Sequence, residues 1–206
     1  MKENKSLYKE FYRLGAKDYK AIVKFYDDNA ANLEDRTSFD DKEEFNTYAL
    51  IMAQYVVGLE NLGKSLRATL FADKVIALIV SKIDEYQIDV SHFTPFRSVL
   101  ASKGRSHFVL KEFKKSEKAF KMLASLEPEN VNFQKWHYTA RSKRRKAVNK
   151  YLFGISLLLI AIALIFGNRI EPPTIKLYLL ILGFLLIWIV AINSVFFDLI
   201  RKLFRR

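Results

Sequence analysis

The sequence contains no cysteine and very little glycine or proline. Its 206 residues include seven glycines and four prolines. The absence of cysteine excludes disulfide bonds, thiolate metal ligands and a cysteine nucleophile. The low glycine and proline content excludes a low-complexity chain and a fold built mainly of loops. A chain of this length is suited to one domain with an additional segment, because single domains usually contain about 100–150 residues.

Sequence motifs of the common enzyme classes are also missing. There is no glycine-rich phosphate loop, no H-E-x-x-H zinc motif and no G-x-S-x-G nucleophile motif. The three histidines, His92, His107 and His137, are too widely spaced to form a metal-ligand motif. We therefore expect a protein that is not an enzyme and that has no catalytic residue, no bound metal and no cofactor.

Positive charge is concentrated in the C-terminal third of the chain. Lys and Arg exceed Asp and Glu by twelve in total. The surplus is two in residues 1–140, six in residues 141–150 and four in residues 151–206. A nucleic-acid-binding domain would carry a basic patch on its folded part, which here is nearly neutral. Nucleic acid is therefore not expected as a partner.

Two long uncharged segments follow the basic residues. Residues 151–167 and 177–197 contain no charged side chain. Because a helix rises about 1.5 Å per residue, roughly 17–25 apolar residues cross a bilayer core. The sequence predicts two transmembrane helices joined by a short external turn, residues 168–176, which contains Pro172 and Pro173. A helical hairpin buried in a soluble core is the alternative, but such helices would show a polar stripe.

The basic residues beside these segments predict their orientation. The turn has only Arg169 and Lys176, whereas the other side has a larger set that we call the basic cluster: Arg141, Lys143, Arg144, Arg145, Lys146, Lys150, Arg201, Lys202, Arg205 and Arg206. The positive-inside rule then places both termini in the cytoplasm, with residues 198–206 as a basic tail. We expect a bacterial inner membrane, and contact of the basic cluster with anionic lipid headgroups at about 1 kcal/mol per residue.

Residues 1–140 are predicted to be helical almost throughout, with residues 1–130 as an array of helical hairpins, so the fold class is all-α. No period-2 alternation or hairpin-turn signal is present. Residues 38–44 have the acidic pattern of a helix start, and apolar residues keep helical spacing after Phe45. Pro95 is suited to the first turn of a later helix, and Pro128 ends the helix that follows.

Three similar segments recur within this helical part. The dipeptides Leu14-Gly15, Leu62-Gly63 and Leu110-Lys111 are 48 residues apart, and each lies between two amphipathic segments. This layout predicts about three helical hairpins. The third resembles a tetratricopeptide repeat at that family's characteristic positions, namely Gly104, His107, Leu110, Phe113, Ser116, Phe120, Leu123 and Pro128. The second matches more loosely, and the first is out of register from Tyr19 onward.

The period of 48 residues exceeds the roughly 34 of that family, so longer helices or links are expected. The resemblance implies a curved array whose concave face binds a partner protein. The candidate partner surface is Asn46, Gln54, Arg97, Arg105 and Lys111. Residues 131–150 would then form a capping and juxtamembrane helix, with Phe133 and Trp136 covering the last repeat. The alternative for these two residues is an anchor at the membrane interface.

These features lead to the hypothesis of a membrane-anchored cytoplasmic adaptor or scaffold. Two alternatives remain open at this point: a self-assembling two-span effector or pore subunit, and an accessory subunit of a larger membrane complex. Asn193 is a candidate intramembrane contact, because an amide in hydrocarbon favours a hydrogen bond across a helix interface. The transmembrane hairpin is also the candidate surface for homo-oligomer formation.

Overall fold

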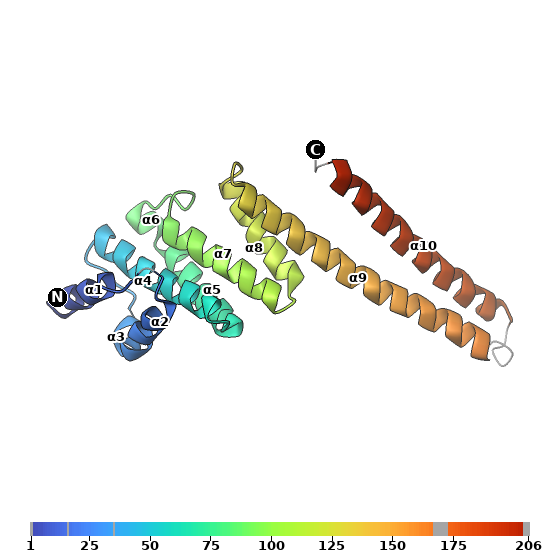
Figure 1. Ribbon diagram of the computed structural model, residues 1–206, viewed down its shortest axis with the longest axis horizontal. Helices are drawn as coiled ribbons and strands as arrows, with labels where there is room; N and C mark the ends of the chain where they lie inside the picture. The colour runs from blue at the N-terminus through green and yellow to red at the C-terminus, as the bar shows by residue number, and fades with distance from the viewer. Residues whose placement is uncertain (1, 16, 35, 167–172, 204–206) are drawn as a thin grey trace. The chain divides into compact units, whose positions relative to one another are not determined.

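The computed structural model describes residues 2–15, 17–34, 36–166 and 173–203, and the side chains of residues 7–15, 17–34, 36–166 and 174–193. The described chain is all-helical and contains no strand (Figure 1). Its helices are α1 (Lys2–Tyr12), α2 (Tyr19–Asp28), α3 (Ala30–Leu33), α4 (Lys42–Asn61), α5 (Ser65–Ser81), α6 (Ile83–Tyr86), α7 (Thr94–Val109), α8 (Phe113–Leu126), α9 (Val131–Phe166) and α10 (Pro173–Leu203). They form two compact units, residues 1–141 (unit 1) and 142–206 (unit 2).

Acidic side chains define the starts of two helices in unit 1. The side chain of Asp41 accepts a hydrogen bond from the backbone N–H of Glu44 at 2.8 Å, so Asp41 is the N-cap of α4. Asp18 caps α2 in the same way, through the N–H of Ala21 at 3.0 Å. Each cap satisfies a backbone donor that has no partner inside the helix. The predicted helix start in residues 38–44 is thus confirmed.

The helices of unit 1 pack mainly against their near neighbours along the chain. Contacts join α2 to α4, α4 to α5 and α7, α5 to α7, and α7 to α8. The core is apolar and aromatic, and its largest fully buried side chains include Tyr26, Phe45, Tyr48, Tyr55, Phe96 and Phe120. Burial of each such side chain contributes about 1.5–3 kcal/mol before the loss of conformational entropy is counted.

The turn after α4 and the turn after α7 have the same backbone hydrogen bonds. The N–H groups of Leu62, Gly63 and Lys64 donate to the carbonyls of Gly58, Glu60 and Leu59. Each of these bonds recurs 48 residues later, from the N–H groups of Leu110, Lys111 and Glu112 to the carbonyls of Ser106, Phe108 and His107. The turn after α1 differs, because there the N–H of Leu14 donates to the carbonyl of Phe11.

The first turns of α9 cover the last helix pair of unit 1. The ring of Trp136 stacks on Phe120, with centroids 5.2 Å apart, and meets Phe108 edge-on at 5.5 Å. Phe133 and Trp136 both pack against the core. Phe133 and Trp136 therefore both cover part of the core of the helical domain.

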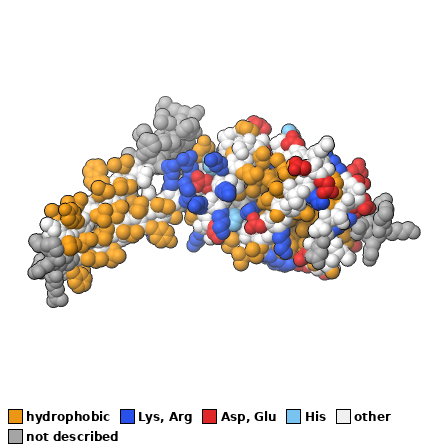
Figure 2. All heavy atoms as spheres, turned by 180° about the vertical axis from the view of Figure 1, so that it is seen from behind, with side chains coloured by type: hydrophobic (Ala, Val, Ile, Leu, Met, Phe, Trp, Pro, Cys, Tyr) orange, Lys and Arg blue, Asp and Glu red, His pale blue; other side chains and the backbone are white. Residues whose placement is uncertain are grey.

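Two helices are long and apolar enough to cross a membrane, Val131–Phe166 and Thr174–Asn193, and unit 2 contains the second helix and the first from residue 142 onward. Only 11% and 6% of their most apolar stretches are buried inside the protein, whereas the core helix of a soluble protein would be mostly buried. On the face seen in Figure 2, hydrophobic side chains cover much of the apolar stretches of these helices.

The second of these helices, α10, begins at Pro173, four residues before the predicted start at Leu177. The predicted turn, residues 168–176, is therefore shorter at its C-terminal end. Proline is accepted at the first position of a helix because the backbone donor that it lacks has no partner there. Residues 167–172, with Arg169, lie outside the described residues. At the other end α10 continues to Leu203, so most of the predicted tail is helical.

Candidate functional site: a groove across unit 1

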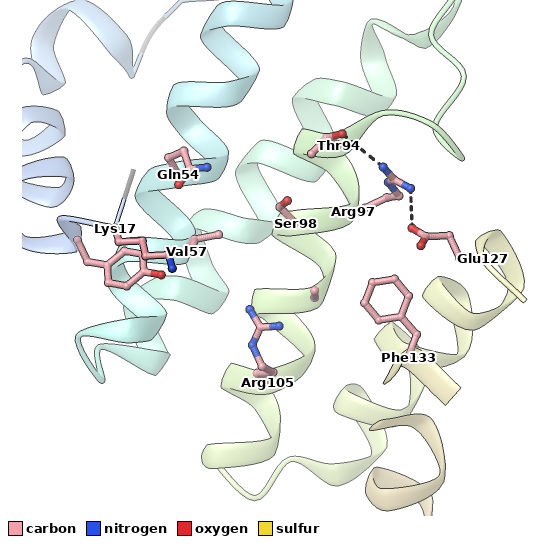
Figure 3. A pocket seen from close by; sticks show the side chains of 11 residues that line it. Lys17, Gln54, Val57, Thr94, Arg97, Ser98, Arg105, Glu127 and Phe133 are labelled. Carbon is pink, nitrogen blue, oxygen red and sulfur yellow. Dashed lines mark hydrogen bonds and ion pairs between the residues drawn. The ribbon is translucent and has the colours of Figure 1, made fainter. Parts of the chain in front are cut away.

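A groove of about 570 Å³ lies on unit 1, formed by segments that are far apart in the sequence (Figure 3). The loop before α2, the first residue of α2, the helices α4 and α7, the link after α8 and the start of α9 all contribute to it. Its lining residues are Lys17, Tyr19, Gln54, Val57, Thr94, Arg97, Ser98, Ala101, Arg105, Glu127 and Phe133.

Helix α7 forms the floor of the groove because its lining residues recur at helical spacing. Arg97 and Ser98 lie three and four positions after Thr94, Ala101 lies three positions after Ser98, and Arg105 lies four after Ala101, so these residues share one face of the helix. The opposite face of α7 is buried in the core. The helix begins at Thr94 with a proline in its first turn, as the sequence predicted.

Arg97 is held at one end of the groove by two neighbours. Its Nη1 donates to Oε1 of Glu127 at 2.7 Å, and its Nη2 donates to Thr94 Oγ1 at 3.3 Å (Figure 3). The second carboxylate oxygen of Glu127 accepts from Asn130 at 2.9 Å. This network ties α7 to the link between α8 and α9, and it neutralises the charge of Arg97.

Arg105 is oriented from the side of α4. Its Nε and Nη2 donate to the two carboxylate oxygens of Glu60 at 2.8 and 2.7 Å, and Nη2 also donates to Ser102 at 3.2 Å. Bidentate pairs of this kind fix the plane of the guanidinium. The Nη1 group of Arg105 makes no hydrogen bond within the described part of the chain, so its two N–H donors are available to a ligand.

The charged side chains that line the groove are mainly cationic, namely Lys17, Arg97 and Arg105 against Glu127. Lys17 is exposed at its rim, and the Gln54 amide points in from α4 (Figure 3). Among the described lining residues Glu127 is the one carboxylate, and it is already engaged by Arg97. Val57, Ala101 and Phe133 provide apolar surface between the polar groups.

Three of the five residues proposed from the sequence as a partner surface meet in this groove: Gln54, Arg97 and Arg105. The other two lie elsewhere. Asn46 is partly buried near the start of α4, and Lys111 is exposed in the turn between α7 and α8.

Several lining residues were not singled out from the sequence: Lys17, Tyr19, Val57, Thr94, Ser98, Ala101 and Glu127. The spacing of the polar residues on α7 was the signal that could have found Thr94 and Ser98.

The basic cluster begins inside the helix α9. Lys143, Lys146 and Lys150 are exposed, and Arg141 forms a long ion pair with Glu117 at 4.0 Å. The side chains of Arg201, Lys202, Arg205 and Arg206 lie outside the described residues. Asn193 is exposed on α10, at the end of its apolar stretch.

No group of three or more His, Asp and Glu side chains suited to a metal ion is found among the described residues. One cluster superficially resembles a catalytic triad. The single atom Nδ1 of His92 faces Oγ of Ser91 at 2.9 Å and Oδ2 of Asp89 at 2.8 Å. A triad needs the two ring nitrogens to face the two partners separately, so this arrangement cannot relay a proton. The cluster is an exposed turn whose hydrogen bonds from Ser91 and His92 lower the pKa of Asp89 to about 2.

Comparisons with protein families, with curated proteins and with solved structures find nothing that matches this chain. Any functional conclusion must therefore be drawn from the groove, the apolar helices and the charge distribution.

Proposed function

We propose that this protein is a membrane-anchored adaptor that binds an acidic, extended segment of a partner protein in the groove of unit 1. Helices α9 and α10 are the anchor, and the basic cluster lies at the headgroups on the cytoplasmic side of a bacterial inner membrane. The protein performs no chemical reaction. The observation that carries the proposal is the groove itself, in which polar groups on the floor formed by α7 lie beside apolar surface from α4, α7 and α9.

The chemistry of the groove supports a peptide ligand. An extended peptide presents a carbonyl at each residue, and these carbonyls accept hydrogen bonds from groups such as Gln54, Ser98 and the free Nη1 of Arg105. An acidic side chain of the ligand would form an ion pair with Lys17, which has no carboxylate partner among the described side chains. Phe133 and Val57 offer apolar surface to an anchoring side chain.

We further propose that the pairs α4–α5 and α7–α8 are tetratricopeptide-like repeats and that α9 caps the array. The shared hydrogen-bond pattern of the two turns supports this proposal. So do buried residues that correspond at a separation of 48: Tyr48 and Phe96, Ile51 and Val99, Met52 and Leu100, Ala53 and Ala101, and Val75 and Leu123. In such arrays the concave face is the binding surface.

Photo-crosslinking from the groove tests the adaptor function. The full chain, expressed in bacterial membranes, would have p-benzoylphenylalanine at Ser98 in the groove or at Val109, an exposed residue outside it. We expect one polypeptide to be captured from Ser98 and not from Val109. The absence of any product specific to Ser98 would contradict the proposal.

Charge substitution at the same position tests the acidic character of the ligand. Ser98→Glu should weaken capture or binding of that polypeptide, because it adds a negative charge to the groove. Ser98→Lys is the matched control and should preserve or strengthen binding. Equal effects of the two substitutions would reject an acidic ligand while leaving the groove as a binding site.

A fusion at the C-terminus tests the orientation. Green fluorescent protein fused after Arg206 should fluoresce, and alkaline phosphatase fused at the same place should be inactive, because the positive-inside rule places this end in the cytoplasm. The reverse result would contradict the proposed topology.

A further inference from the structure

One edge of unit 1 is formed by the links between its helix pairs. Lys42, at the start of α4, donates a hydrogen bond at 3.3 Å to the carbonyl of Gln87, in the link before α7. Arg97, in the first turn of α7, pairs with Glu127 in the link between α8 and α9. We call this side the link edge, and it is made up of residues 36–44, 82–93 and 127–130. It carries nine acidic and three basic residues, so its charge is negative.

The opposite edge of unit 1 is formed by the turns that follow α4 and α7. The ends of these two helices lie together, because Arg105 forms a bidentate ion pair with Glu60. We call this side the turn edge, and it is made up of residues 61–67 and 109–115. It carries five basic residues and one acidic residue, so its charge is positive. Helix α7 runs from one edge to the other, and its 16 residues span about 24 Å.

The turn edge presents exposed lysines beside exposed apolar side chains. Lys64, Lys111 and Lys114 are exposed and have no carboxylate partner among the described side chains. Leu66 and Val109, close to them in the sequence, are 65% and 66% exposed. Lysines with neighbouring apolar side chains are suited to the headgroup region of an anionic bilayer, where the charge stays hydrated and the apolar group is buried.

Helix α9 crosses unit 1 from the link edge toward the turn edge (Figure 1). It begins directly after Asn130, and its Trp136 meets Phe108, near the end of α7, at 5.5 Å. Its Arg141 lies 4.0 Å from Glu117, near the start of α8. Unit 1 ends at Arg141, so the chain leaves this unit on the side of the turn edge. The residues that follow contain the rest of the basic cluster and the apolar part of α9.

We propose that unit 1 docks on an anionic lipid surface through the turn edge. The occupant is a lipid surface because the lysines of this edge complement anionic headgroups and because the chain leaves unit 1 toward the membrane on the same side. The link edge is repelled by that surface, so the domain has one favoured orientation, with its acidic side toward the cytoplasm. This inference rests on the proposed membrane anchor and does not require a ligand in the groove.

Quenching of a fluorophore by spin-labelled headgroups measures the docking. The full chain is reconstituted in vesicles of phosphatidylcholine, with or without phosphatidylglycerol, that contain a lipid with a nitroxide on its headgroup. The chain has no cysteine, so the fluorophore NBD can be attached at Val109→Cys in the turn edge or at Asp84→Cys in the link edge. We expect stronger quenching at position 109 than at position 84 in vesicles with phosphatidylglycerol, and a loss of this difference at high salt.

Charge reversal tests which side chains make the contact. Lys111→Glu with Lys114→Glu, combined with the label at position 109, should shift the equilibrium toward the undocked state about tenfold or more and reduce the quenching. Lys74→Glu with Lys135→Glu is the matched control, because it makes the same change in net charge at exposed lysines outside the turn edge. The control should leave the quenching unchanged. Circular dichroism of each variant checks the fold, since exposed substitutions rarely change it.

Equal quenching at the two labelled positions would overturn the proposal, and so would unchanged quenching in the variant with glutamate at positions 111 and 114. Flotation with vesicles of phosphatidylcholine alone separates the docking from the anchor, because insertion of apolar helices requires no anionic lipid. A chain that floats with these vesicles but is not quenched at position 109 in anionic vesicles contradicts the docking alone. A chain that does not float contradicts the anchor and the docking together.

Discussion

Gly63 and Lys111 occupy equivalent positions in two turns with identical hydrogen bonds, and both have left-handed backbone, with φ of 74° and 62°. Glycine adopts this conformation at no steric cost, whereas a side chain is strained by about 1 kcal/mol. We therefore predict that Lys111→Gly stabilises unit 1. Thermal unfolding of the full chain in detergent, followed by circular dichroism, should show a midpoint higher by about 2–4 °C.

Gly63→Ala is the matched control for this prediction. No atom lies within 4 Å of a Cβ added at Gly63, so the substitution changes only the backbone preference. We expect a midpoint lower by a similar amount. If Lys111→Gly were neutral or destabilising while Gly63→Ala lowered the midpoint, the side chain of Lys111 would contribute a contact that outweighs its strain.

Trp136 is predicted to stabilise the helical domain. Its contacts with Phe120 and Phe108 are aromatic and partly buried, and Trp136→Ala should cost about 2–4 kcal/mol, somewhat less than a fully buried tryptophan. Tyr138→Ala, two residues along the same helix, removes a side chain that is 58% exposed and should have little effect. Equal thermal midpoints for the two variants would instead favour a role of Trp136 outside the domain.

The helical architecture could be predicted because its signals are local. The cap at Asp41, the proline that opens α7 and the glycine at position 63 each act within one turn of the helix they begin or end. The start of α10 was predicted four residues too late. Leu177 is the first residue of the apolar run, whereas the helix begins at Pro173. Hydrophobicity identifies the apolar part of a helix, and caps and prolines identify its ends.

The groove was predicted only in part because it joins distant segments. Lys17 and Phe133 are separated by more than half of the chain, and no spacing rule connects them. Arg105 was proposed from its place on a repeat-like helix, but its pairing with Glu60 on another helix depends on how α4 and α7 pack. Leu66 and Leu70 of α5 fit the same helical periodicity as the core residues, yet they are 65% and 59% exposed, since exposure is decided by the packing of the whole unit.

Gly183 is predicted to hold the two apolar helices of unit 2 together. A Cβ at this position would lie 2.7 Å from Cγ1 of Ile160 and 3.2 Å from the carbonyl oxygen of Ser156. Gly183→Leu should therefore separate α9 from α10, because the backbone of Ser156 cannot move as a side chain does. The expected result is a lower thermal midpoint of the full chain in detergent and faster proteolysis.

Gly154→Leu is the control for the hairpin. Gly154 lies in α9, and nothing lies within 4 Å of a Cβ added there. This variant makes the same glycine-to-leucine change without a clash, so its stability should remain close to that of the wild type. If both variants lowered the thermal midpoint equally, leucine would act through its bulk or hydrophobicity at either position. That result would contradict the packing of Gly183 against Ile160.

His107 is predicted to make the stability of unit 1 dependent on pH. Burial lowers the pKa of His107 below its ordinary value of 6.5, and Lys103 and Lys115 act in the same direction. A hydrogen bond to Glu112 at 2.6 Å opposes the shift without cancelling it. The unfolded chain therefore takes up a proton at a higher pH than the folded chain. Stability that is present above pH 6.5 is lost as the pH falls from 6.5 toward the lowered pKa.

Replacing His107 with Leu isolates this effect, since Leu59 is the buried residue at the equivalent position of the preceding helix pair. Thermal midpoints of the wild type and His107→Leu are compared between about pH 7.5 and pH 5. We expect the midpoint of the wild type to fall further than that of the variant. The pKa of His137 is also lowered, first of all by burial, but His137 is present in both proteins and cancels in the comparison. Parallel curves for the two proteins would mean that His107 does not bind its proton more weakly in the folded state.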